Sequence, residues 1–143
     1  MKIRNFITMT DLSQEELYHI LDRADTLREC WQTKTMPQSL ADQLVGLWFY
    51  GNGFRNRIAF EIGARAMGAD VTCIPGELGV HEPIEDIGHY LKNWFTFLVI
   101  RAQDHDNLTT LAKDAAVPVI NARTSYNHPC EILGDLQYIR TIR

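Results

Sequence analysis

The sequence predicts an α/β domain of three layers, with a four-stranded parallel sheet flanked by helices. Four short apolar runs recur along the chain, and segments with helical periodicity separate them. Nearly continuous apolar strands that alternate with amphipathic helices are typical of parallel sheets with right-handed crossovers. The length of 143 residues suits one domain, so we expect residues 1–143 to form a single domain.

The first predicted element is an amphipathic helix from Asp11 to Trp31. Its apolar residues recur at spacings of three and four, which is the period of one helix face. Ser13 and Glu16 have the spacing of a capping box, in which each side chain accepts a backbone N–H of the other residue. The segment from Gln32 to Asp42 is polar and contains a proline, so we expect a connector there.

The remaining elements alternate between strand and helix. Strands are predicted over Leu44 to Tyr50, Ala69 to Ile74, Thr96 to Ile100 and Val117 to Asn121. Helices are predicted over Arg55 to Met67, Pro83 to Trp94, Asp104 to Ala115 and from His128 onward. Open parallel sheets bind their ligands at the carboxyl ends of the strands. The loops that begin at Gly51, Pro75, Arg101 and Ala122 are therefore the expected functional loops.

Composition and charge exclude several classes of partner. Fourteen Lys and Arg residues against eighteen Asp and Glu residues give a net charge of -4, which does not suit a nucleic-acid backbone. No apolar run approaches the roughly 18 residues of a membrane span, and no signal peptide is recognisable. The three cysteines form no C-x-x-C pair, so we expect small buried apolar side chains, no zinc site and a reducing cytoplasm.

The loop after the first predicted strand has the features of an anion-binding turn. It reads Gly51-Asn52-Gly53-Phe54-Arg55-Asn56-Arg57 and stands directly before a helix. Glycines allow close backbone approach, the start of a helix offers free N–H groups, and arginine forks match phosphate or carboxylate oxygens. The alternative is a plain turn in which Arg55 and Arg57 pair with surface acids. A dinucleotide site is the weakest interpretation, because Asn56 stands where the third glycine would be.

Two further cations fall at strand ends that should meet the same edge of the sheet. Arg101 follows the third predicted strand, and His128 precedes Pro129 at the start of the last helix. A histidine such as His128, taken alone, is more often a helix-capping or surface residue than a ligand-binding one. The acidic segment from 76 to 83, which contains His81, could be a solvated connector.

These residues together resemble the carbamoyl-phosphate-binding domain of the aspartate and ornithine carbamoyltransferases. The resemblance covers nearly the whole chain. It rests on Phe6 to Leu17 as a first-helix signature, Phe49 to Glu61 as a phosphate loop and helix, Val99-Ile100-Arg101, Pro118 to Asn121, and His128-Pro129-Cys130. The family has Ser-Thr-Arg-Thr-Arg in the phosphate loop, so Arg55 and Arg57 match. Gly53, Phe54 and Asn56 replace the three hydroxyl residues.

The resemblance implies a mechanism and a set of site residues. Arg101 and His128 would be catalytic and would bind the carbamoyl oxygen while the amino group of an amino acid attacks. The substrate-binding residues that it implies are Gly53, Phe54, Arg55, Asn56, Arg57, Glu131 and His81. Glu131 stands where the family has glutamine, and His81 stands in the loop that carries a lysine reaching into a neighbouring subunit. No cofactor and no metal are implied.

The resemblance also implies partners and a domain organisation. The expected ligands are carbamoyl phosphate or a related anion and an amino acid, and the expected assembly is a homo-oligomer, a trimer as in relatives. The family's second, amino-acid-binding domain is missing from this chain, so we expect the donor-binding half of a longer enzyme, inactive by itself. The alternative is a non-catalytic relative that serves assembly or small-anion sensing.

Overall fold

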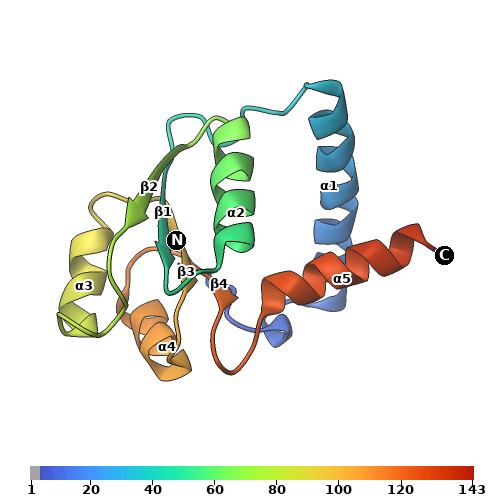
Figure 1. Cartoon of the computed structure of the whole chain (residues 1–143). Helices are drawn as coiled ribbons and strands as arrows, with labels where there is room; N and C mark the ends of the chain where they lie inside the picture. Colours follow the sequence, from blue (N-terminus) through green and yellow to red (C-terminus); the bar gives the residue numbers. More distant parts are fainter. Residues whose placement is uncertain (1–3) are drawn as a thin grey trace.

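The computed structural model describes residues 4–143 and contains one four-stranded sheet and five α-helices in that range (Figure 1). The elements in chain order are η1 (Met9–Asp11), α1 (Gln14–Thr33), β1 (Leu44–Phe49), α2 (Phe54–Ala66), β2 (Asp70–Ile74), α3 (Ile84–Leu91), β3 (Phe97–Arg101), α4 (His105–Asp114), β4 (Val119–Arg123) and α5 (Pro129–Thr141). The predicted alternation of strands and helices is thus confirmed. None of the helices in this range is both long and apolar enough to cross a membrane.

The order of the strands creates a topological switch point between β1 and β3. All strand pairs are parallel, and the order across the sheet is β2-β1-β3-β4. The chain leaves β1 toward β2 on one side and later returns with β3 on the other side of β1. The connections that follow β1 and β3 therefore diverge, and such a switch point is where open α/β sheets bind ligands.

Helices cover both faces of the sheet, as predicted. Figure 1 shows α3 and α4 on one face and α1, α2 and α5 on the other. Leu98, Ile100 and Val119 belong to the core beneath α3 and α4, whereas Val45 and Val99 belong to the core beneath α2. Side chains that alternate along one strand thus enter different cores.

The sequence predicts that helices cover the strands, and β2 differs because it lies at an edge of the sheet. Asp70, Thr72 and Cys73 are exposed, so this strand is not covered like its neighbours. The expectation that each cysteine is buried is therefore wrong for Cys73, although Cys30 and Cys130 are partly buried. All three cysteines are free.

The segment before α1 extends the sheet beyond β4. The N–H of Phe6 donates to the carbonyl oxygen of Val119 at 2.9 Å, and the N–H of Asn121 donates to the carbonyl oxygen of Phe6 at 2.8 Å. The predicted capping box then begins α1, since Ser13 Oγ accepts from the N–H of Glu16 at 3.2 Å and Glu16 Oε2 accepts from the N–H of Ser13 at 2.8 Å.

Candidate functional site

A cavity of about 350 Å³ lies at the carboxyl ends of the strands; we call it the strand-end cavity. It is lined by Asn52, Gly53, Phe54, Arg55, Asn56, Arg101, Arg123, His128 and Glu131. The structure therefore brings together all the sequence-predicted site residues except Arg57 and His81. The functional roles of these side chains stay predictions.

The start of α2 forms one wall of the strand-end cavity. Gly53 is the N-cap residue, and no side chain in residues 4–143 caps the helix there. The first N–H groups of a helix have no intrahelical partner, and the helix dipole is positive at this end. Phe54 is 65% exposed, so its ring lies at the surface rather than in the core. This wall is suited to bind an anion through the backbone.

The guanidinium of Arg101 lies directly against Gly53. A Cβ atom at Gly53 would lie 2.6 Å from Cζ of Arg101, which is closer than real contacts allow. The backbone of Gly53 has a negative φ, so a side chain here would disturb the position of Arg101 and not the backbone conformation. The residue that ends β3 thus reaches across to the helix that follows β1.

A second arginine, Arg123, stands beside Arg101 at the end of β4. The regular pairing of Ile100 with Asn121 is followed by a register shift, after which Arg101 pairs with Arg123. Sequence reasoning missed Arg123 because it ended the strand at Asn121. The pKa of Arg101 is lowered, chiefly by burial and next by the positive charge of Arg123. Within residues 4–143, neither arginine forms an ion pair with a carboxylate at contact distance.

His128 caps α5 and presents its ring to the strand-end cavity. Nδ1 accepts the backbone N–H of Glu131 at 3.3 Å. Nε2 lies 2.8 Å from the side-chain amide of Asn56 and 3.5 Å from Oε2 of Glu131. The pKa of His128 is lowered, mainly by burial and further by Arg123 and Arg101, although Glu131 opposes the shift. Burial thus favours the neutral form of the ring.

A buried amide network fixes the loop that carries His128. Asn121 is fully buried, and its Nδ2 donates to the carbonyl oxygen of Ile7 at 2.9 Å and to Oδ1 of Asn127 at 2.6 Å. Asn127 donates to the same carbonyl oxygen of Ile7 at 3.2 Å. Next to His128, burial raises the pKa of the Cys130 thiol to about 12, so this cysteine is not a thiolate nucleophile.

Two predicted site residues lie outside the strand-end cavity. Arg57 is exposed on α2 and does not line the cavity. It is two positions from Arg55, and such positions do not face the same side of a helix. His81 lines a different cavity, of about 280 Å³, together with Trp48 and Tyr90. Its predicted role concerned a neighbouring subunit, and this single chain does not test that role.

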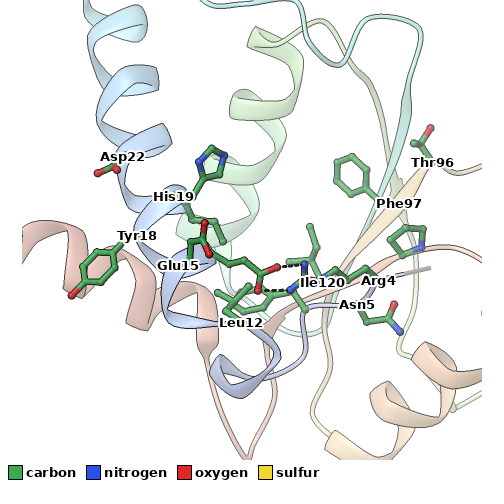
Figure 2. A pocket seen from close by; sticks show the side chains of 14 residues that line it. Arg4, Asn5, Leu12, Glu15, Tyr18, His19, Asp22, Thr96, Phe97 and Ile120 are labelled. Carbon is green, nitrogen blue, oxygen red and sulfur yellow. Dashed lines mark hydrogen bonds and ion pairs between the residues drawn. The ribbon is translucent and has the colours of Figure 1, made fainter. Parts of the chain in front are cut away.

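A larger groove, of about 980 Å³, lies on another part of the molecule (Figure 2). It lies between α1 and the region where β3 and β4 begin, with Phe97 and Ile120 in its apolar wall. Its main charged pair, Arg4 with Glu16, is already satisfied internally. Because ligand chemistry concentrates at strand carboxyl ends, we take the smaller strand-end cavity as the functional site. Within residues 4–143, no group of three or more His, Cys, Asp or Glu side chains could hold a metal ion.

Comparison with known proteins identifies the family. Residues 4–141 match the model of the aspartate/ornithine carbamoyltransferase carbamoyl-P binding domain. The chain belongs to this carbamoyltransferase family. The resemblance inferred from the phosphate loop, the Arg101 strand end and the His128 loop is thus confirmed.

Individual relatives agree with this carbamoyltransferase assignment. The chain is 36% identical over 140 residues to an ornithine carbamoyltransferase of Acinetobacter baumannii and 34% identical to one of Psychrobacter cryohalolentis, in each case over 96% of this chain and 46% of the relative. The solved ornithine carbamoyltransferase of Burkholderia thailandensis superposes with a TM-score of 0.93 at 27% identity, covering 99% of this chain and 50% of that one. That of Pyrococcus furiosus gives 0.90 at 27% identity, covering 95% and 44%. The chain spans about half the length of the curated relatives that it matches.

Proposed function

We propose that this chain binds carbamoyl phosphate in the strand-end cavity and forms the donor-binding half of a carbamoyltransferase. The enzyme would transfer the carbamoyl group to the amino group of an amino acid. The observation that carries this proposal is that three groups converge on one cavity: the uncapped start of α2, Arg55 and Arg101. Neither arginine has a carboxylate partner at contact distance in residues 4–143.

The geometry suits the polarity of this reaction. The phosphate would lie at the start of α2 near Arg55, where N–H groups and a guanidinium meet. The carbamoyl oxygen would face Arg101 and the ring of His128. When the amine nitrogen attacks the carbonyl carbon, charge builds on that oxygen, and donors already aimed at it stabilise the transition state. The new C–N bond then replaces the C–O bond, the nitrogen loses a proton, and phosphate departs with the electron pair.

Glu131 would help to orient carbamoyl phosphate, because its negative charge is opposite to that of the arginines. Its carboxylate lines the strand-end cavity and lies 3.5 Å from the ring of His128. A carboxylate is an acceptor only, so it could receive the N–H of a carbamoyl amide but not the oxygen. The carbamoyl group would thereby be oriented with its NH₂ toward Glu131 and its oxygen toward Arg101.

The first experiment is a calorimetric titration with carbamoyl phosphate, comparing the unchanged chain with Arg55→Ala. We expect weaker binding by about 1.5–3 kcal/mol, the usual effect of losing a hydrogen bond to a charged group, with little change in thermal stability. Arg57→Ala removes the same charge two positions along α2 and should leave the affinity nearly unchanged. An equal loss in both variants would indicate a general field effect and not a contact from Arg55.

Further ligands separate this proposal from its alternatives. No response of the unchanged chain to carbamoyl phosphate, inorganic phosphate or NAD would favour the non-catalytic assembly role. Binding of inorganic phosphate alone would favour small-anion sensing, and binding of NAD would favour a dinucleotide site.

We also propose a cytoplasmic homo-oligomer, a trimer as the family resemblance implies. The three free cysteines suit a reducing compartment.

Tyr90 and Trp94, with 63% and 58% of their surface exposed, pack on one another near the His81 cavity, whereas Phe95 packs against the core. We expect sedimentation equilibrium to give a mass above that of the monomer, and Trp94→Ala to lower it. A monomer at high concentration would contradict this assembly.

A further inference from the structure

A second cavity, of about 330 Å³, adjoins the strand-end cavity; we call it the side cavity. Arg101 and Arg123 line both cavities, and Tyr50, Ala102, Gln103, Thr124 and Ser125 complete the side cavity. The donor-binding role proposed above uses Arg55, Arg101 and His128. It leaves Arg123 and the side cavity without a function.

A bulge at the end of β4 brings Arg123 to the side cavity. Val99 pairs with Ile120 and Ile100 with Asn121, so regular pairing would set Ala122 opposite Arg101. The register shift places Arg123 there instead. Paired residues of neighbouring strands share a face of the sheet, and bulges next to active sites commonly redirect one side chain. The fold thus sets two arginines side by side on the cavity face.

Two adjacent guanidinium groups repel each other. Glu131 offsets part of their charge from the strand-end cavity, but the lining of the side cavity contains no acidic residue. Arg123 has no carboxylate within ion-pair distance in residues 4–143, and Arg101 has none either. The positive charge of each arginine acts on the other, since Arg123 lowers the pKa of Arg101. A bound anion would relieve this repulsion and accept the forked donors.

The order of the strands indicates which anion would bind to Arg101 and Arg123. The phosphate-binding start of α2 follows β1, Arg101 ends β3, and Arg123 ends β4, which is the next strand along the sheet. Adjacent strands lie about 4.8 Å apart. Along the edge of the sheet, the groups of the reacting complex would therefore follow in sequence: leaving phosphate, carbamoyl oxygen, and then a group of the attacking molecule.

We propose that Arg123, together with Arg101, binds a carboxylate of the acceptor in the side cavity. The acceptor would then be an amino acid that reacts through an amine on the same carbon as that carboxylate. An amine at the far end of a side chain would carry its carboxylate beyond the reach of a residue one strand from Arg101. This inference rests on the proposed function and specifies its second substrate.

Three phosphonate probes test the proposal on the 143-residue chain by calorimetry. Phosphonoacetamide represents the donor alone, and N-phosphonoacetylglycine adds a carboxylate on the carbon next to the nitrogen. The amide of phosphonoacetate with 4-aminobutyrate has the same charge but a more distant carboxylate. We expect the glycine compound to bind at least about tenfold more tightly than the other two, the effect of one charge-assisted hydrogen bond.

Arg123→Gln should remove this tenfold preference for the glycine compound over the aminobutyrate compound, whereas Arg123→Lys should restore part of the preference. Arg23→Gln, which removes an equal charge from the exposed face of α1, should preserve it. If Arg123→Gln instead weakened the binding of all three probes by the same factor and kept the preference, Arg123 would be assigned to the phosphonate and the proposal would be overturned. Equal binding of the glycine and aminobutyrate compounds to the unchanged chain would also overturn it. Failure of every probe to bind the unchanged chain would overturn the proposed donor site as well.

Discussion

Gly53→Ala is expected to weaken carbamoyl phosphate binding by about 3 kcal/mol, roughly a hundredfold, while the fold stays intact. The added methyl group would occupy space held by the guanidinium of Arg101, 2.6 Å from its Cζ. Because a guanidinium is the free end of a long side chain, it can move away at little cost to stability. It would then lose its position beside the start of α2, where the donor is expected to bind. Calorimetry of ligand binding, together with thermal unfolding, measures both effects.

Gly63→Ala provides the matched control for this substitution. Gly63 lies in the same helix, and a Cβ at that position meets nothing within 4 Å. Alanine in a helix interior is favoured over glycine by roughly 0.5–1 kcal/mol, so this variant should be slightly more stable and bind equally well. If Gly53→Ala also bound equally well, the position of Arg101 against Gly53 would have no part in ligand binding.

Asn121→Ala is expected to lower the free energy of unfolding by about 3 kcal/mol. The substitution removes two buried donors, leaves Oδ1 of Asn127 with weaker partners and opens space in a packed interior. Oδ1 of Asn121 has no hydrogen-bond partner in the described chain, so the amide is retained for its donors. Urea unfolding followed by circular dichroism gives the value.

Asn93→Ala serves as the control for the loss of an asparagine. Asn93 is exposed, and its amide donates to two carbonyl groups at the end of α3 at 3.3 Å each. Surface substitutions of this kind usually change stability by less than about 0.5 kcal/mol. Similar losses in Asn93→Ala and Asn121→Ala would show that burial of the amide network contributes little.

The fold could be predicted because its signals are local. The capping box of Ser13 and Glu16 and the spacing of apolar residues locate α1, and each apolar run marks a strand. The edge position of β2 could not be predicted, because the apolar run from Ala69 to Ile74 indicates a strand without showing which strands flank it. The exposed Cys73 follows from that edge position.

The site could be predicted only as far as strand ends and helix starts reveal it. Arg101 and His128 directly follow or precede a recognisable element, so both could be placed at the cavity. Arg57 could have been excluded, since helical geometry turns it away from Arg55. Arg123 could not have been placed, because only the pairing register distinguishes the end of a bulged strand from the first residues of a loop.

The pairing of Phe6 with β4 couples the segment before α1 to the loop that carries His128. Its contacts, among them Asn5 with Val119 and Ile7 with Asn121, join residues 114 positions apart. Contacts between residues so distant require closure of a long loop and are typically among the later ones to form during folding. The carbonyl oxygen of Ile7 also accepts from Asn127, the neighbour of His128. Departure of this segment from the sheet therefore releases the loop that orients His128, and a ligand that holds His128 in place also suppresses this local unfolding.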